Sequence, residues 1–352
     1  MERQLLKILR TVAPGTPLRE GLEHILRSKS GALIVVGDND KVMEIAEGGF
    51  VVNAEFSPAR LYELAKMDGA IIVSEDTKRI MAANAQLIPD LSIPSSETGI
   101  RHRTAERVAK QTGMLVISIS QRRGVITVYK GSTKYVLRDL EVVLAKANQA
   151  VQTLEKYRAV LNQAVVNLTV LEFEDTVTLF EVAKAIQRTE MTLRIVKEIE
   201  HYISELGSEG RLIVMQVEEL VTNVENEGLL IIQDYYVVEE KAPKDILSII
   251  ESWPAEDLLD LSLIARVLGF SGGAGILEQV VSPRGYRILS RLPRLPFPVI
   301  ENIARTFGNF SRILQASIEE LDDVEGIGET RARLIKEGLK RYWNQLLQER
   351  YR

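Results

Sequence analysis

Two short motifs in the first third of the chain combine residue types suited to chemistry on a nucleotide. The first, Asp68-Gly69-Ala70, places a carboxylate beside a glycine at the start of an apolar run. The second, Gly99-Ile100-Arg101-His102-Arg103-Thr104, groups cationic and proton-donating side chains at the expected start of a helix. A carboxylate that can hold a divalent metal, together with a cluster of donors for phosphate oxygens, is the minimum equipment for reactions of a nucleoside triphosphate.

The second motif has the features of an anion site. A helix N-terminus offers unpaired N–H groups and the positive end of the helix dipole. Arg101 and Arg103 add bidentate geometry that matches phosphate oxygens, and His102 can donate to a phosphate with a charge that follows pH. Ile100 is expected on the inward face of this helix, together with Ala105, Val108 and Ala109. Taken alone, the motif also fits a charged helix start whose side chains lie in water.

The first motif is expected where a helix ends and a buried strand begins. Gly69 would permit an unusual backbone angle or the close approach of a ligand. Asp68 could coordinate a divalent metal, or accept a hydrogen bond from a ribose hydroxyl and help to activate it as a nucleophile. The alternative is a helix-to-strand turn in which Asp68 only satisfies nearby N–H groups.

A third motif, Val324-Glu325-Gly326-Ile327-Gly328, is suited to binding the DNA backbone. Two glycines allow a sharp turn, and Ile327 between them is expected to fill the space between two helices. The N–H groups would then face outwards at a helix start, where they can bind a DNA phosphate. Arg331 and Lys336 could add contacts of positive charge. The alternative is a helical hairpin that only packs.

Length and composition describe a globular protein of several domains. The 352 residues exceed one ordinary core, and the 26% of charged residues is usual for such proteins. No apolar run is long enough for a bilayer, and the charged N-terminus lacks the apolar segment of a signal peptide. The absence of cysteine excludes disulfides and thiolate metal sites, so we expect a cytoplasmic protein that does not contact a membrane.

Charge divides the chain into three blocks. The net charge is +5 over residues 1–138, −14 over residues 139–283 and +4 over residues 284–352. Polyanionic ligands are therefore expected at the two ends rather than in the middle. An unevenly charged, solvated surface is the other interpretation.

Periodicity predicts a mixture of helices and strands over residues 1–138. Helices are expected at 18–26, at 58–66 with Ser57 as N-cap, and at 101–111 with an end at Gly113. Strands are expected at 32–36, 42–46, 70–74, 79–87, 114–120 and 124–129. This pattern predicts an α/β N-terminal domain with a mixed central sheet.

From Asp139 onwards helical spacing dominates. Helices are expected at 139–166, 179–206 and 212–224, and the Pro-rich stretch 291–298 opens the last part. We therefore expect an all-α middle domain at 139–290 and an all-α domain at 291–352. The last domain resembles a tandem helix-hairpin-helix unit, with helices expected over 297–317, 318–324 and 329–342. The first copy has Phe307-Gly308-Asn309-Phe310 at its turn.

The order, separation and flanks of the first two motifs closely resemble those of the diadenylate cyclase domain. With the helical middle and the C-terminal hairpin, the whole chain is similar to the bacterial family of DNA integrity scanning proteins. The resemblance implies condensation of two ATP molecules into cyclic di-AMP with release of two pyrophosphates. Each ATP would attack the other across a near two-fold axis, so one domain would hold half an active site and a facing pair of subunits would complete it.

The resemblance also assigns roles to residues. Asp68 would lie near the attacking hydroxyl and a Mg²⁺ or Mn²⁺ ion, and Gly69 and Leu87 would line the nucleotide pocket. Ile100 to Thr104 would hold phosphates, with Ser120 on the next strand. The family further implies a homo-octamer and a preference for branched or junction DNA that reports DNA damage. We also expect such DNA to lower synthesis through the helical middle.

Two other functions fit parts of the sequence. One is a non-catalytic, structure-specific DNA-binding protein whose N-terminal domain only senses ATP. The other is a repair enzyme that acts on DNA itself. The second is less well supported, because no carboxylate cluster or catalytic lysine accompanies the hairpin at Gly326–Gly328.

Overall fold

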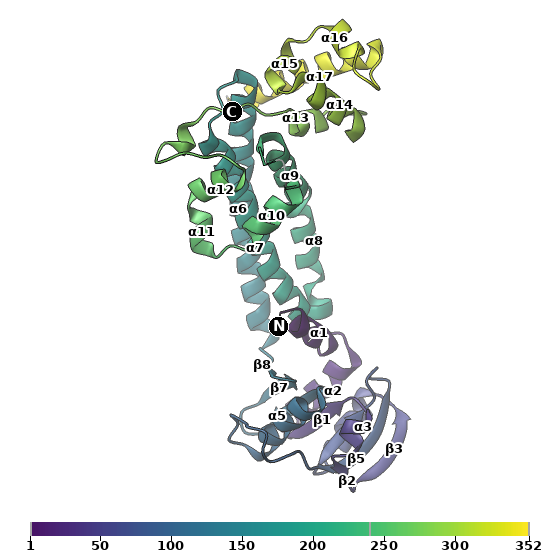
Figure 1. Ribbon diagram of the computed structural model, residues 1–352. Helices are drawn as coiled ribbons and strands as arrows, with labels where there is room; N and C mark the ends of the chain where they lie inside the picture. Colours follow the sequence, from purple (N-terminus) through teal and green to yellow (C-terminus); the bar gives the residue numbers. More distant parts are fainter. Residues whose placement is uncertain (1, 239–240, 351–352) are drawn as a thin grey trace. The chain divides into compact units, whose positions relative to one another are not determined.

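The computed structural model describes residues 2–238 and 241–350 (Figure 1). Contacts between Cα atoms divide the chain into two compact units. The first comprises Met1–Gln149 and Glu198–Gln216, and the second comprises Ala150–Lys197 and Val217–Arg352. Because long helices run from one unit into the other, this division does not test the three domains expected from the sequence, which remain a prediction.

The first unit is built on a mixed sheet whose strands follow the order β2-β5-β4-β1-β6-β7-β8, with β3 paired to β5. Strand β1 runs parallel to β4 and antiparallel to β6, which confirms the predicted mixed sheet. The bounds are β1 (Ala32–Val36), β2 (Ala46–Glu47), β3 (Phe50–Glu55), β4 (Ala70–Val73), β5 (Arg79–Leu87), β6 (Leu115–Ser120), β7 (Val125–Lys130) and β8 (Thr133–Val136).

Helices cover both faces of this sheet. They are α1 (Glu2–Thr11), α2 (Pro17–Arg27), α3 (Asp40–Met43), α4 (Pro58–Leu64) and α5 (Ile100–Thr112). Side chains alternate along β1, so Ile34 joins a core with α1, α2 and α4, whereas Val35 joins a core with α3 and α5. Burial on both faces explains why β1 is a continuous apolar run without polar alternation.

Local signals in the sequence set several helix boundaries. The Ser57 side chain accepts a hydrogen bond from the Arg60 amide at the start of α4, as expected for an N-cap. Helix α5 ends at Gly113, which adopts a left-handed conformation with φ of 73°. Both boundaries lie within two residues of the predicted ones, and both position the loops beside the sheet.

The strand predicted at 42–46 is wrong. Asn39 accepts a hydrogen bond from the Val42 amide and starts the short helix α3, which leaves only Ala46–Glu47 to pair with β5. Strands β3 and β8 were not predicted, because neither shows a clear apolar alternation. In β3 the pairing register shifts between Val51 and Ala54, and Val51 is 90% exposed.

Long helices follow the sheet. Helix α6 (Leu140–Glu174) is longer than predicted, and α7 (Leu179–Leu206) matches its prediction. The helix predicted at 212–224 is instead α8 (Arg211–Val221), which is separated from α9 (Val224–Tyr235) by Asn223 in a left-handed conformation with φ of 63°. The next helices are α10 (Pro243–Glu251), α11 (Ala255–Leu259), α12 (Leu261–Val267) and α13 (Tyr286–Ser290).

The C-terminal helices pack around a separate cluster of apolar side chains within the second unit. They are α14 (Phe297–Phe307), α15 (Phe310–Gln315), α16 (Ile318–Asp322) and α17 (Glu329–Arg350). Phe310, the first residue of α15, and Ile327, in the turn before α17, are both buried in this cluster. The helical character predicted for this part of the chain is confirmed.

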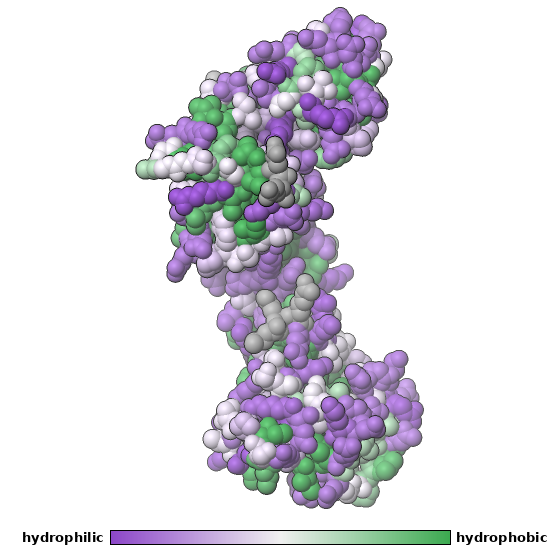
Figure 2. All heavy atoms as spheres, in the orientation of Figure 1, coloured by the Kyte–Doolittle hydropathy of each residue, from purple (hydrophilic) through white to green (hydrophobic). Residues whose placement is uncertain are grey.

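None of the helices described between residues 2 and 350 combines the length and the apolarity needed to span a bilayer. Figure 2 shows hydrophilic residues over most of the visible face, with hydrophobic residues scattered among them.

A fully buried polar network joins α6, α9 and α13 within the second unit. The Arg287 guanidinium donates to Glu172 and to the Thr169 hydroxyl, and the Tyr235 hydroxyl donates to Glu172 at 2.8 Å. Asp234 accepts hydrogen bonds from the backbone amides at the start of α13. Burial raises the pKa of the Glu172 carboxyl, and the Arg287 guanidinium acts in the opposite direction. Each of these charges depends on its partners, because the side chains that carry them are almost completely buried.

We predict that Glu172→Gln lowers the free energy of unfolding of the second unit by about 3–5 kcal/mol, since it removes the carboxylate that pairs directly with the buried Arg287 guanidinium. Trp253 and Trp343 both lie in this unit, so urea denaturation followed by tryptophan fluorescence measures it. The control is Glu155→Gln on the exposed side of α6, with an expected change within about 0.5 kcal/mol. Equal changes in the two variants would contradict the importance of the network.

Candidate nucleotide site

A cavity of about 830 Å³ lies at one end of the sheet in the first unit. Strands β1 and β4 begin at this end and the antiparallel strands β5 and β6 finish there. The predicted site residues that line it are Gly69, Leu87, Ile100, Arg101, His102, Thr104 and Ser120. Residues that line it and were not predicted are Leu33, Ala70, Asn84, Ala85, Gln86, Gly99, Ile119, Gln121 and Arg122. Asp68 and Arg103 are chain neighbours of lining residues but do not line the cavity.

Gly69 is required by the backbone of β5. Its φ is +91°, and an added Cβ would lie 2.8 Å from the Asn84 carbonyl carbon and 3.0 Å from the Ala85 carbonyl oxygen. Asn84 is itself left-handed, with φ of 54°, where the pairing of β4 and β5 is irregular. The two strands thus approach more closely at the edge of the cavity than a side chain at residue 69 would allow.

Asp68 is exposed beside this junction and is the acidic candidate for a metal. Among the residues that the structure describes, no group of three or more His, Asp or Glu side chains could hold a metal ion. This arrangement fits Mg²⁺ in nucleotide enzymes, which is commonly held by one or two carboxylates together with substrate phosphates. The donor set therefore accommodates a metal that arrives with its nucleotide.

The first turn of α5 presents free backbone donors to the cavity. Gly99 is the N-cap and provides no side-chain hydrogen bond, and the first helical bond runs from the Arg103 amide to the Gly99 carbonyl at 2.9 Å. The earlier amides of the turn therefore have no partner within the helix. Ile100 is 80% exposed and lines the cavity, so its predicted place on the inward face is wrong. The core contacts of α5 begin at Ala105.

Arg101 is placed by the absence of a side chain at Gly31. A Cβ at residue 31 would collide with the Arg101 guanidinium, and it would lie 3.3 Å from the Ile119 carbonyl oxygen. Gly31 therefore lets the guanidinium fold back against the start of β1 while the residue still lines the cavity. Nothing in the spacing of the sequence connects these two residues.

A chain of polar contacts fixes the ring of His102. The His102 Nδ1 lies 3.0 Å from the Tyr129 hydroxyl, which donates to Glu97 Oε1 at 2.8 Å. Lys134 pairs with the same carboxylate at 2.5 Å. Because the tyrosine proton is given to Glu97, the Tyr129 oxygen accepts from His102, which assigns the proton to Nδ1 in the neutral ring. Tyr129, Glu97 and Lys134 come from separate elements and were not predicted.

Electrostatics keep His102 neutral near pH 7. Burial lowers the pKa of His102 below its usual 6.5; Glu97 opposes this effect, and Arg123, Lys134 and Arg101 add to it. Burial also acts to raise the pKa of Glu97, but hydrogen bonds from Lys134 and Tyr129 outweigh it, so that pKa is lowered. A histidine with a depressed pKa in the folded state costs stability as pH falls below the unfolded value near 6.5. Above that pH the site is stable with neutral His102.

The loop before α5 is tied to the helix that it precedes. Glu106 accepts from the Ser95 hydroxyl at 2.5 Å and from the Ser96 amide at 3.0 Å. Lys110 donates to the Pro94 carbonyl at 2.8 Å. These bonds hold the segment that carries Glu97 beside the first turn of α5.

Two further predicted residues have local partners. The Arg103 guanidinium reaches the Thr98 carbonyl at 3.5 Å and is half-buried outside the cavity. The Ser120 hydroxyl accepts from the Arg123 amide at 3.2 Å, in the turn between β6 and β7. Ser120 thus shapes the turn that brings Arg122 to the cavity wall.

The C-terminal hairpin has the geometry expected from its glycines. Gly326 is left-handed, with φ of 85°, and a Cβ there would lie 3.3 Å from Val299. The amides of Arg331 and Ala332 donate to the Gly328 carbonyl at the start of α17. The Arg331 guanidinium folds back on the Gly326 carbonyl. Lys336 donates to the carbonyls of Leu314 and Ala316 at 2.8 and 2.6 Å, so its ammonium joins the end of α15 to α17.

Comparison with known proteins agrees with this geometry. Residues 19–134 match a family described as the nucleotide-binding region of the DisA bacterial checkpoint controller, and residues 137–277 match its linker region. The DNA integrity scanning protein DisA of Carboxydothermus hydrogenoformans is 67% identical over 97% of both chains. The protein of that name from Clostridium perfringens is 58% identical over 97% of this chain and 96% of its own. Its counterpart from Clostridium botulinum is 54% identical over 98% of both chains.

The mixed α/β fold and the phosphate donors at a helix start define a nucleotide-binding protein with a helical second part. Identity over nearly the whole length makes the relationship specific: the chain belongs to the DNA integrity scanning protein family, and its first domain is a diadenylate cyclase domain. The resemblance inferred from the motifs is confirmed.

We predict that Tyr129→Phe slows synthesis of cyclic di-AMP about fivefold to tenfold, because one hydrogen bond to His102 is lost and the ring is free to turn. Initial rates with ATP at pH 7.5 measure this effect. Tyr135→Phe is the control, since it removes a similar bond to Glu205 outside the cavity, and its rate should not change. A wild-type rate for Tyr129→Phe would contradict the role of the chain of contacts.

Proposed function

We propose that each cavity binds one ATP and that two subunits face each other to join the two nucleotides into cyclic di-AMP. The observation that carries this proposal is the placement of Gly69, Arg101 and His102 around one cavity that also has apolar walls. The 3′-oxygen of each ATP attacks the α-phosphorus of the other. The bond from that phosphorus to pyrophosphate breaks, and two pyrophosphates leave. One chain supplies one such cavity, so a two-fold pair is the smallest arrangement that can close the ring.

The residues divide between binding and charge neutralisation. Leu33 and Leu87 offer apolar surface to the adenine base. The free amides of the first turn of α5 and the Arg101 guanidinium hold phosphate oxygens. Thr104 and Ser120 add hydroxyl groups, and Arg103 adds positive charge next to the cavity. Neutral His102, with its proton on Nδ1, presents Nε2 as an acceptor rather than as the phosphate donor expected from the sequence; this atom is buried and has no hydrogen-bond partner among the described residues.

Asp68 is proposed to lie near the attacking hydroxyl and to hold Mg²⁺ or Mn²⁺ together with the substrate phosphates. When bound, the ion withdraws charge from the phosphates and favours departure of pyrophosphate. An oxygen of the exposed Asp68 carboxylate that does not hold the ion could accept a hydrogen bond from the ribose hydroxyl, and the proton of that hydroxyl passes to water.

We further propose that the C-terminal hairpin binds the backbone of branched or junction DNA and that a homo-octamer brings cyclase domains face to face in the cytoplasm. Gly326, Ile327 and Gly328 form the turn before α17, whose first amides can bind a phosphate. Arg331 lies beside them. Lys336 is proposed to hold the two helical hairpins together rather than to reach DNA, because its hydrogen bonds already join α15 to α17.

The cyclase assay tests the proposed roles. With ATP and Mg²⁺ or Mn²⁺, we expect the wild-type protein to form cyclic di-AMP, detected by chromatography. Asp68→Asn, and Arg101→Ala combined with His102→Ala, should lower the rate by at least about a hundredfold with an unchanged fold. Asp38→Asn, an exposed acid after the other end of β1, is the matched control and should remain active. A strictly monomeric preparation with undiminished turnover would refute the paired site.

The hairpin is tested by DNA binding. Gly326→Ala forces a side chain onto a left-handed backbone and should weaken binding of a four-way junction about tenfold or more, as measured by fluorescence anisotropy. Gly273→Ala, where an added Cβ meets open space, is the control. Because the contacts are to phosphates, binding should weaken steeply as salt rises.

Saturating junction DNA should also lower the rate of the cyclase, and an unchanged rate would exclude that coupling.

A further inference from the structure

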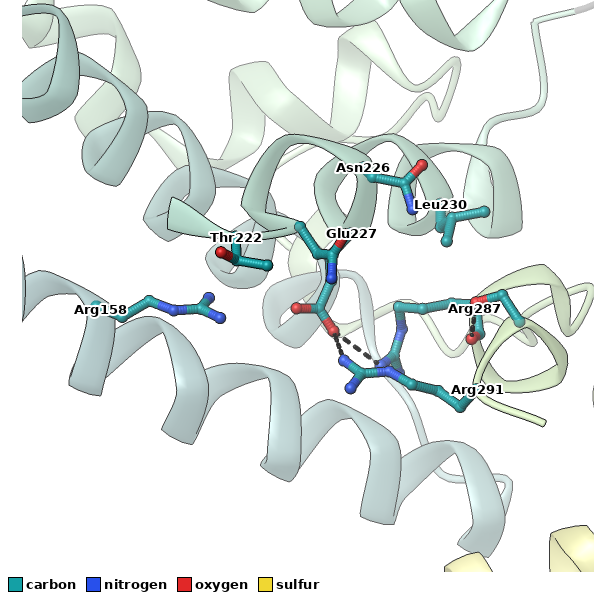
Figure 3. A pocket seen from close by; sticks show the side chains of 9 residues that line it. Arg158, Thr222, Asn226, Glu227, Leu230, Arg287 and Arg291 are labelled. Atoms are coloured by element: carbon teal, nitrogen blue, oxygen red, sulfur yellow. Dashed lines mark hydrogen bonds and ion pairs between the residues drawn. The ribbon is translucent and has the colours of Figure 1, made fainter. Parts of the chain in front are cut away.

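A second polar cavity lies in the helical unit and has no part in the proposed reaction. It has a volume of about 290 Å³ and is enclosed by α6, the start of α9 and the region of α13 (Figure 3). Arg158 reaches it from α6, and Arg287 and Arg291 reach it from α13 and just beyond. Their guanidinium groups converge on the carboxylate of Glu227 (Figure 3). Three cations and one anion therefore line a small space.

Arg287 forms the floor of this cavity and retains unused donors. Its side chain is 1% exposed, and Nη2 is committed to Glu172 and Thr169. Nε and Nη1 have no hydrogen-bond partner within residues 2–238 and 241–350. Nη1 lies 3.9 Å from Glu227 Oε1, which is too long for a hydrogen bond. A buried guanidinium rarely leaves two of its nitrogens unsatisfied, so these donors indicate an acceptor from outside the chain.

The other walls add donors of the same kind. Arg158 Nη1 is buried and has no partner, and its side chain points toward Glu227 in Figure 3. Arg291 pairs with Glu227 at the exposed side of the cavity. Asn226 and Ser290, which are exposed, stand at the opening with neutral polar groups. The carboxylates of Glu172 and Asp234 are occupied by Arg287, Tyr235 and the amides at the start of α13.

We propose that this cavity is a binding site for a phosphoryl group, of the size of inorganic phosphate or pyrophosphate. The unused donors belong to two arginines that approach from different helices, and a tetrahedral oxyanion offers acceptors in several directions. A carboxylate offers two oxygens in one plane and matches this arrangement less well. The volume admits a phosphate or a diphosphate. Pyrophosphate is also the product that the proposed reaction releases.

The test is isothermal titration calorimetry on the full-length chain. Arg101→Ala and His102→Ala are included in every sample to weaken phosphate binding in the nucleotide cavity, and the variants of the second cavity identify its share of the remaining binding. Inorganic phosphate, pyrophosphate and acetate are titrated separately without added metal. We expect one site per chain for phosphate or pyrophosphate and much weaker binding of acetate. Because cyclase activity is not measured, failure of this proposal is distinguishable from failure of the proposed function.

Three variants assign the binding to the cavity. Arg158→Gln should weaken the affinity about tenfold, because it removes the Nη1 donor, which has no partner among the residues that the structure describes. Lys156→Gln, which removes the same charge from an exposed position on α6, should leave it unchanged. Glu227→Gln should tighten binding severalfold, since the competing carboxylate is lost, and a purely structural role for Glu227 would not produce a gain.

A final arm separates the sources of the phosphoryl group. A short duplex is added to the pyrophosphate complex. Retention of pyrophosphate supports a free ion as the ligand, and displacement that Arg158→Gln abolishes supports a phosphate of the DNA backbone at the same site. The proposal would be overturned if neither phosphate nor pyrophosphate bound. It would also be overturned if adding Arg158→Gln to the protein with Arg101→Ala and His102→Ala left the affinity unchanged.

Discussion

The close approach of strand β5 to Gly69 is the constraint on which the nucleotide site depends. Because no side chain stands at residue 69, the two backbones come together at the end of the sheet, and the cavity opens beside them. A second glycine, Gly31, makes room for the Arg101 guanidinium on the neighbouring strand. Chemistry on phosphates is therefore possible here because two positions carry no Cβ and the donors of α5 can occupy the space.

In both units, polar side chains inside the fold are paired with other polar groups. In the first unit, Lys134, Glu97 and Tyr129 form a sequence of contacts that ends on His102 and sets which ring nitrogen carries the proton. In the second unit, Glu172 and Arg287 are held by hydrogen bonds from three helices. The cost of burying a charge is offset by partners in each case, and donors that lack a partner mark places where a ligand can bind.

Local signals explain most of the correct predictions. Ser57 and Gly113 mark helix ends through their own backbone and side-chain chemistry, and the apolar run of β1 marks a strand buried on both faces. The strand predicted at 42–46 fails because the side chain of Asn39 captures the Val42 amide and favours a helical turn. Ile100 fails as a core residue because it lies in the first turn of α5, which projects over the cavity.

The sequence alone determined the class of the fold, the position of the helix start at Gly99 and the glycine hairpin, since each depends on residues close together along the chain. Only the tertiary structure decided that Tyr129 and Glu97 orient His102, that Gly31 accommodates Arg101 and that Lys336 joins two helices. It also brought Arg158, Arg287 and Arg291 around one cavity. These contacts join residues that are distant along the chain. The packing of the sheet and the helices creates them, so the spacing of the residues in the sequence does not predict them.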